Sequence, residues 1–204
     1  KNAKIYTMSE RVIEKGDILI ENGKIKEIGT NLDYQAKVID ATGKLVFPGF
    51  IDAHCHIGMW EEGIGFEGAD GNEMTDPITP HLRAIDGINP MDEAFENALK
   101  GGVTSAATGP GSANVIGGTF SVLKLHGDRV DDMVVTETLA MKCAFGENPK
   151  RVYSQKKSMP STRMGTAAKL RETLAKSFEY YNKIKEAGDD SSKLPSYDMK
   201  LEAM

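Results

Sequence analysis

Short runs of alternating apolar and polar residues fill the first 47 positions and predict a small antiparallel sheet. A two-residue hairpin is predicted at Asn22-Gly23, a favoured pair for the tight turn between two strands. Strands this short bury too little apolar surface for a stable domain, so the region is expected to pack against something else. The expected strands are residues 3–7, 17–21, 24–28, 37–40 and 44–47.

Longer units follow from residue 47 onward. A buried strand is expected at residues 47–56, a helix at 93–100 and a strand at 103–107. Asn89 is the expected N-cap, with Pro90 at the first helical position and Asp92 at the third, and Gly101-Gly102 is the stop signal. A strand, a helix and a strand in that order predict a right-handed βαβ unit with a parallel pair.

The rest of the chain predicts further strands and one long helix. Residues 119–125 and 134–144 are expected to be further strands or a strand with a helical tail. The run at 119–125 follows the previous strand too soon for an easy crossover helix, and it is either an excursion or the next parallel strand. Apolar residues recur every three or four positions over 166–187, which predicts an amphipathic helix. A new apolar rhythm after Pro195 ends at Met204, and we interpret the chain as a fragment of something larger.

Composition excludes several classes of protein. The chain has 204 residues, of which 40% are hydrophobic and 27% charged, so disorder is not expected. A net charge of -5 without a basic cluster disfavours nucleic acid and anionic membranes as partners. The absence of a long apolar run or a signal-peptide pattern predicts a cytoplasmic protein, and Cys55 and Cys143 do not form a CxxC pair, so no disulfide framework is expected.

His54 and His56 are the sharpest chemical feature of the sequence. Side chains two apart in a strand project to one face, so both imidazoles can converge on one ion while Cys55 faces the other way. Neutral imidazole suits zinc and similar divalent ions. The alternative is a pair of hydrogen-bonded histidines in the core or at its rim. Their position at the carboxyl end of a strand, where α/β active sites are built, favours the metal.

A long polar loop at residues 58–89 follows the histidines, and long loops in compact domains are usually functional. Asp70 and Glu73 are candidates to order this loop or to contact a polar substrate. Arg83 is a candidate to clamp a substrate carboxylate with two hydrogen bonds. For each of the three, a solvated surface position remains the alternative.

The segment FPGFIDAHCH at residues 47–56 resembles the first barrel strand of the amidohydrolase superfamily. The β-rich stretch before it, which ends in VIDATGK at 38–44, and GGVTS at 101–105, which is similar to the family's second strand, support the same resemblance. The imidazolonepropionase-related branch is the most similar part of the family, on residues 68–73, 109–114 and 146–150.

This resemblance implies an α/β architecture and a metal-dependent hydrolase. Residues 1–47 would be part of a small β-sandwich, and residues 48–204 the first half of a TIM (β/α)8 barrel. His54 and His56 would hold a divalent metal, with zinc expected, at the barrel mouth. A metal-activated hydroxide would hydrolyse amide or cyclic amide C-N bonds of a small molecule. Lys142 is the candidate for the carboxylated lysine that bridges two metals in many members, with Lys124 as its competitor and a lysine reaching solvent from a helix as the alternative.

The family's remaining ligands and its general-base aspartate have no counterparts in this sequence and are expected beyond Met204. The chain alone is therefore expected to bind metal poorly and to be inactive. It should associate with itself as a homo-oligomer or with the missing C-terminal half. Two other functions stay open: a non-catalytic, barrel-derived scaffold or subunit that acts through association, and a deaminase of the same superfamily.

Overall fold

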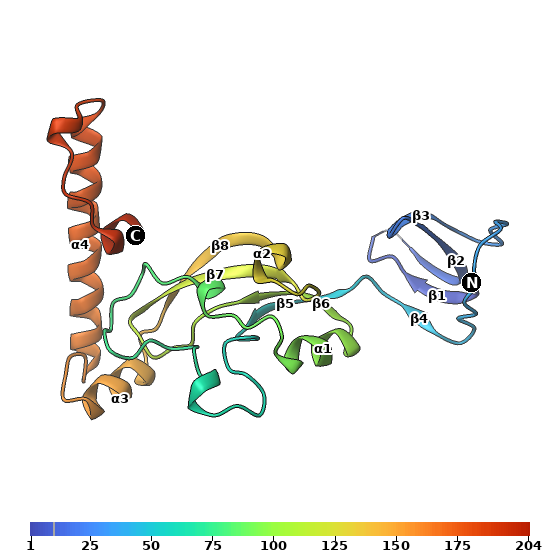
Figure 1. Cartoon of the computed structure of the whole chain (residues 1–204), viewed down its shortest axis with the longest axis horizontal. Coiled ribbons are helices and arrows are strands. Elements are labelled where there is room, and N and C mark those ends of the chain that lie inside the picture. The colour runs from blue at the N-terminus through green and yellow to red at the C-terminus, as the bar shows by residue number, and fades with distance from the viewer. Residues whose placement is uncertain (10) are drawn as a thin grey trace. The chain divides into compact units, whose positions relative to one another are not determined.

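The computed structural model describes residues 1–9 and 11–204 and divides into two compact units, Lys1–Phe50 and Ile51–Met204. The sequence predicted the division after residue 47. The chain is mixed α/β, with one four-stranded sheet in the order β3-β2-β1-β4 and another in the order β5-β6-β7-β8. Figure 1 shows the strands and helices of both units.

The first unit contains β1 (Ala3–Tyr6), β2 (Val12–Glu21), β3 (Lys24–Gly29) and β4 (Leu45–Val46). The predicted hairpin is confirmed: β2 pairs antiparallel with β3, and Asn22 and Gly23 take the positive φ values of 52° and 72° that such a turn needs. The wholly antiparallel prediction is wrong, because β4 pairs parallel with β1 after a long connection. The strand predicted at residues 37–40 does not form, and the backbone carbonyl of Ile39 instead accepts a hydrogen bond from the Lys1 amino group (2.8 Å).

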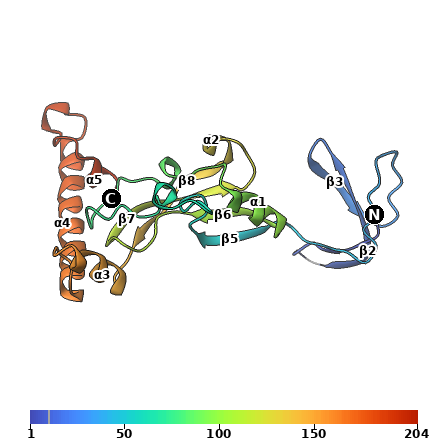
Figure 2. The ribbon, with the colours of Figure 1, turned by 60° about the horizontal axis from the view of Figure 1, so that its bottom comes forward.

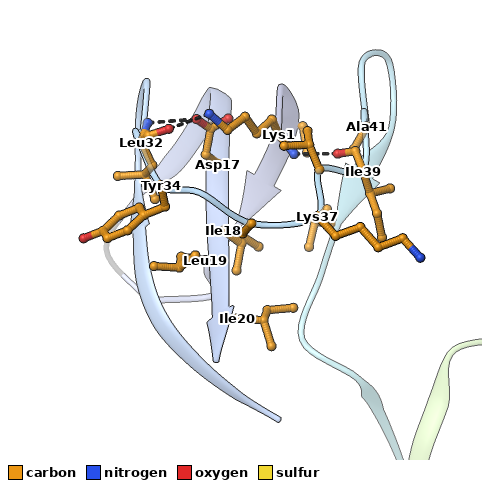
Figure 3. Close-up of a pocket in the computed structure, with 15 residues that line it drawn as sticks. Lys1, Asp17, Ile18, Leu19, Ile20, Leu32, Tyr34, Lys37, Ile39 and Ala41 are labelled. Carbon is orange, nitrogen blue, oxygen red and sulfur yellow. Dashed lines mark hydrogen bonds between the residues drawn. The ribbon is translucent and has the colours of Figure 1, made fainter. Parts of the chain in front are cut away.

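A cavity of about 300 Å³ lies in this first unit and is shown in Figure 3. Its walls are mostly aliphatic, with Ile18, Leu19 and Ile39 among them. The buried Asp17 carboxylate accepts backbone N–H groups of Asn2 (2.9 Å) and Leu32 (3.0 Å), which lowers its pKa and ties the start of the chain to the segment after β3. None of the predicted site residues lines this cavity.

The second unit is built on β5 (Phe50–Cys55), β6 (Val103–Thr108), β7 (Ile116–Lys124) and β8 (Val134–Cys143). β7 is antiparallel to both β6 and β8, so β6 and β8 run in the same direction. The carboxyl ends of the neighbouring strands β5 and β6 also meet, since the Thr108 hydroxyl donates to the Ile57 carbonyl (2.9 Å). Three strands therefore end at one edge of the sheet, with β7 reversed between β6 and β8.

The reversal of β7 answers a question that the sequence left open. The run predicted at residues 119–125 is an excursion, because the connection after β6 is too short for a crossover helix and folds back as an antiparallel pair. The described strands form an open sheet with one reversed strand. They do not by themselves show the predicted half barrel, in which successive strands are parallel.

The described α-helices of this unit are α1 (Glu93–Lys100), α2 (Val130–Met133), α3 (Glu147–Gln155), α4 (Arg163–Ala187) and α5 (Met199–Glu202), beside three short 3-10 helices. The cap of α1 is Asp92, whose carboxylate accepts the Ala94 N–H (3.3 Å), and not Asn89 as the start signals predicted. Asn89 instead accepts the Met91 N–H (3.0 Å) in the turn before the helix. The long helix expected at 166–187 begins three residues earlier, because Thr162 caps it by accepting the Gly165 N–H (3.0 Å). Among the described residues, no helix is long and apolar enough to cross a bilayer.

The core of the second unit joins the 58–89 loop, α1 and one face of the sheet. Its buried members come from distant parts of the chain: Met59, Ala84, Ile88, Phe95, Ala106, Leu123, Leu125 and Met133. The prediction of a buried strand at residues 47–56 is wrong, because Phe50 is 53% and Ile51 73% exposed. β5 lies at the end of the strand order and has a single neighbour, as Figure 2 shows, so one side of this strand is uncovered.

Candidate metal centre

The candidate centre lies where β5, β6 and β8 end together. β5 ends at Cys55, and His54 and His56 are its neighbours in the sequence. Gly109 is the first residue after β6, and Lys142 is the second-last residue of β8. Because the carboxyl ends of strands that run in the same direction meet at one edge, residues far apart in sequence converge here.

The structure brings His54 and His56 together on one side of the strand. Their ring centroids are 5.6 Å apart, and the rings are nearly perpendicular, with an interplanar angle of 86°. Both contact the ring of Phe120, at centroid distances of 5.0 Å for His54 and 6.2 Å for His56. Cys55 points to another neighbour, with its Sγ 3.6 Å from the Ala107 carbonyl oxygen, which agrees with its expected role in packing.

His56 is oriented by a backbone hydrogen bond. Its Nδ1 lies 2.7 Å from the Gly109 carbonyl oxygen, which can only accept, so Nδ1 carries the proton. Nε2 of the neutral ring therefore keeps its lone pair. Metal-binding histidines are typically held in this way, with one ring N–H donated to a carbonyl and the other nitrogen free for the ion.

Lys142 stands beside His54. Its Nζ lies 3.4 Å from His54 Nε2 and 5.6 Å from the centroid of the Phe120 ring. Desolvation lowers the pKa of the Lys142 ammonium. Desolvation, and then the positive charge of Lys142, lowers the pKa of His54, which favours the neutral imidazole that a metal needs.

Lys142 and Lys124, the two candidates for the carboxylated lysine, have different surroundings. Lys142 lies on a strand, not on a helix from which it would reach solvent. Lys124 instead donates to the Ser105 hydroxyl (3.0 Å), on the neighbouring strand β6. Only Lys142 of the two is placed at the histidine pair.

The two histidines provide some, but not all, of the ligands that a divalent cation needs. Two imidazoles on one face, one of them oriented by the hydrogen bond from its Nδ1 to a backbone carbonyl, are typical zinc ligands, whereas a catalytic zinc usually has three protein ligands. Within residues 1–9 and 11–204, no group of three His, Cys, Asp or Glu side chains converges as a metal site. Lys142 is the third polar side chain at the pair, and it is a ligand only if its amine is modified or deprotonated.

The three substrate-contact candidates line one cavity. Asp70, Glu73 and Arg83 all lie in the wall of a space of about 660 Å³, which also includes Pro110 and Gly117. Pro110 follows the Gly109 that anchors His56, and a Cβ placed on Gly117 would lie 3.6 Å from Cγ of Lys142. The cavity and the histidine pair therefore share the 109–117 segment.

The side chain of Arg83 is already occupied within the chain. Nε and Nη2 donate to the two oxygens of Asp86 (3.0 and 2.7 Å), and Nη1 donates to Glu137 (2.7 Å). These carboxylates, Asp86 first, raise the pKa of the guanidinium. Arg83 links the loop to β8, and clamping a substrate carboxylate would require one of these ion pairs to open.

Glu73 is likewise hydrogen-bonded within its own loop, although both Glu73 and Asp70 are exposed. The Glu73 carboxylate accepts from the hydroxyl (2.5 Å) and N–H (3.0 Å) of Thr75, which lowers its pKa. Its carbonyl accepts from the buried Asn114 amide (2.6 Å), whose oxygen is held by the Tyr153 hydroxyl (2.5 Å). These contacts hold Glu73 within its loop.

Comparison with known proteins identifies the family. A search of protein-family models finds no match. Over 192 residues, 86% of this chain, the sequence is 35% identical to the amidohydrolase TasK of Hapsidospora irregularis. The whole chain superposes on a solved amidohydrolase from Thermotoga maritima MSB8 with a TM-score of 0.92 and 48% sequence identity. The chain belongs to the amidohydrolase superfamily.

Other members of the amidohydrolase superfamily match a shorter stretch. A D-hydantoinase of Geobacillus stearothermophilus is 53% identical over 60 residues, and a dihydroorotase of Caldicellulosiruptor saccharolyticus is 45% identical over 60 residues. The chain spans 19% of the length of TasK and 53% of the solved Thermotoga amidohydrolase. The superfamily is thus confirmed, while these relatives do not identify the imidazolonepropionase-related branch.

Sequence reasoning missed two aromatic residues of this amidohydrolase centre. Phe120 contacts both imidazoles, and Trp60 has its ring centroid 5.2 Å from that of His56. Trp60 had a readable signal, since it is the only tryptophan and lies four residues after His56 in the loop that follows the strand. Phe120 had none, because its place beside the histidines depends on how β7 folds back.

Proposed function

We propose that the chain carries the first part of the active site of a metal-dependent enzyme that hydrolyses C-N bonds of a small molecule. The observation that carries the proposal is the histidine pair at the carboxyl edge of the sheet, in which the Nδ1 of His56 is hydrogen-bonded to the Gly109 carbonyl and Nε2 is left for a metal. Relatives named as an amidohydrolase, a dihydroorotase and a D-hydantoinase support this reaction class.

His54 and His56 would hold the cation through their neutral rings. When bound, a divalent cation such as zinc lowers the pKa of a water to about 7 and polarises a substrate carbonyl. His56 keeps its orientation because Nδ1 is hydrogen-bonded to the Gly109 backbone. The long loop supplies the neighbouring cavity, in which the exposed Asp70 carboxylate would accept a hydrogen bond from a polar substrate.

Lys142 would complete the centre as a carboxylated lysine. The neutral amine adds to CO₂, so that an N–C bond forms, one C=O π bond becomes a carboxylate and the amine proton leaves to solvent. The desolvation that lowers the Lys142 pKa increases the fraction of neutral amine. The product presents carboxylate oxygens in place of the ammonium beside His54, which replaces a repulsive charge near the cation with an attractive one.

Two finer assignments belong to the same proposal. β5, β6 and β8 run in the same direction and would be strands of a TIM barrel, with β7 as an addition between β6 and β8. The imidazolonepropionase-related branch is supported by the resemblance of residues 68–73, 109–114 and 146–150. A 5-methylthioadenosine/S-adenosylhomocysteine deaminase of Pyrococcus furiosus, 48% identical over 60 residues, favours deamination as the second candidate reaction.

A product analysis tests the reaction class. The chain, and a longer form made by joining to it the part of the Thermotoga relative that it does not cover, are incubated with zinc, cyclic amides, linear amides and aminopurines. We expect the longer form to open a cyclic amide, with a product heavier by one water, and this activity to disappear with a chelator. The 204-residue chain alone is expected to be inactive.

The same assay separates the alternatives. Release of ammonia from an aminopurine without ring opening would replace the amide hydrolase with the deaminase. No turnover of any substrate by the longer, zinc-loaded form would contradict the enzyme proposal and favour a non-catalytic scaffold.

A further inference from the structure

We propose that Trp60 is a substrate-recognition residue, and that its indole face selects substrates with a planar, unsaturated ring. The proposal rests on the proposed function, because it takes His54 and His56 to mark the reacting centre. The indole lies next to His56, with centroids 5.2 Å apart and an interplanar angle of 74°. A group bound at the histidines would therefore meet the indole.

The loop is shaped to receive this ring. A Cβ added to Gly71 would lie only 1.9 Å from Cη2 of Trp60, and one added to Gly111 would lie 3.0 Å from the same atom. The two glycines are joined by a hydrogen bond from the Gly111 N–H to the Gly71 carbonyl (2.8 Å). The indole thus packs directly on the Gly71 backbone, where no larger residue fits without moving it, and lies beside Gly111, where a side chain would first meet Asn72.

Trp60 stays partly open to solvent despite this packing. Its exposed fraction is 39%, whereas a tryptophan that only filled the core would be largely covered. It also forms a β-bridge with Ala69, and both Ala69 and Gly71 line the cavity of about 660 Å³. The indole therefore lies between the wall of the cavity and the ring of His56.

Four aromatic rings border the candidate centre: His54, His56, Trp60 and Phe120. Aromatic faces attract flat π-systems by offset stacking or edge-to-face contact, worth about 1 kcal/mol beyond the area that is buried, or about fivefold in affinity. A puckered, saturated ring of the same size cannot make this contact over its whole face. The surface thus favours an unsaturated, planar ring over its saturated analogue.

A purely structural role for Trp60 makes a different prediction. If the indole only fixed the loop, replacing it would lower thermal stability without changing the preference between two ring shapes. The readout that separates the roles is therefore a ratio of affinities, measured beside the melting temperature.

The test uses 2-pyridone, which is planar and unsaturated, and 2-piperidone, its saturated analogue, titrated by ligand-observed NMR into the metal-free chain. We expect the chain to bind 2-pyridone about fivefold more tightly than 2-piperidone. Trp60→Leu should make the two affinities equal, and Trp60→Phe should keep part of the preference. Phe178→Leu, which removes an exposed aromatic ring from α4, is the matched control and should change nothing.

A second variant keeps the test decisive if Trp60→Leu does not fold. Gly71→Ala keeps Trp60 but displaces its indole from the Gly71 backbone. The ratio of the 2-pyridone to the 2-piperidone affinity should therefore fall, and the wavelength of the tryptophan fluorescence should shift. The proposal would be overturned if the unchanged chain bound 2-pyridone and 2-piperidone equally. It would also be overturned if folded Trp60→Leu or Gly71→Ala kept the full preference for 2-pyridone. Since the rings are titrated without metal, failure of the metal centre would appear separately, as absent zinc binding.

Discussion

Replacing both His54 and His56 with alanine is expected to weaken zinc binding to this chain by at least about 100-fold. Loss of a group that only orients a metal ligand typically costs 10- to 100-fold in affinity, and this change removes the ligands themselves. Competition with a fluorescent zinc chelator measures the difference. The affinity of the unchanged chain is expected to be modest, because its described residues offer two imidazoles and one lysine and no cluster of three conventional ligands.

A matched histidine change gives the control. His126 is exposed in the turn after β7, so His126→Ala should bind zinc as the unchanged chain does. Each single variant, His54→Ala and His56→Ala, should fall between the unchanged chain and the double variant. Equal zinc affinity in the double variant and in His126→Ala would show that zinc binds elsewhere.

The second large effect is expected at Lys142. Replacing it with methionine should abolish any increase in metal affinity that bicarbonate produces, because methionine cannot take up CO₂. We expect bicarbonate to raise the affinity of the unchanged chain about tenfold, since a carboxylate would replace an ammonium 3.4 Å from His54 Nε2. With labelled bicarbonate, a carbamate carbon signal should appear in the unchanged chain and be absent from Lys142→Met.

Lys124 provides the comparison for this experiment. It lies on β7 and is hydrogen-bonded to Ser105, so Lys124→Met should keep both the bicarbonate effect and the carbamate signal. A bicarbonate effect that persists in Lys142→Met, or that is lost only in Lys124→Met, would remove Lys142 from the centre.

Local signals predicted much of the fold. The Asn22-Gly23 turn and the presence of the helices α1 and α4 each depend on residues close in sequence, and each is found in the structure. The predicted apolar face of α4 is not packed, because Phe178 is 65% and Tyr181 59% exposed. The parallel pairing of β4 with β1 and the reversal of β7 depend on where distant segments meet. The alternation of apolar and polar residues within a strand carries no information on which strand it pairs with. The parallel pairing of β4 was therefore not predicted, and the direction of β7 was left open.

The same distinction applies to the candidate centre. The two-residue spacing in β5 was enough to expect His54 and His56 on one face, and the structure brings their rings together. The choice between Lys142 and Lys124 was not decidable from the sequence, because it depends on the register of β8 on β7. Arg83 is paired with Glu137, which lies on β8 and far away in the chain. The sequence therefore could not predict that the guanidinium of Arg83 is already bound to carboxylates of this chain.

X-ray absorption at the zinc edge, on the zinc-loaded chain, tests the metal centre most directly. Two imidazole nitrogens at about 2.0–2.1 Å from zinc, with the outer-ring scattering of two histidines that disappears in the His54→Ala/His56→Ala double variant, are the predicted result. A spectrum without imidazole scattering, or one that is identical in the double variant, would contradict the assignment of this histidine pair as a metal centre.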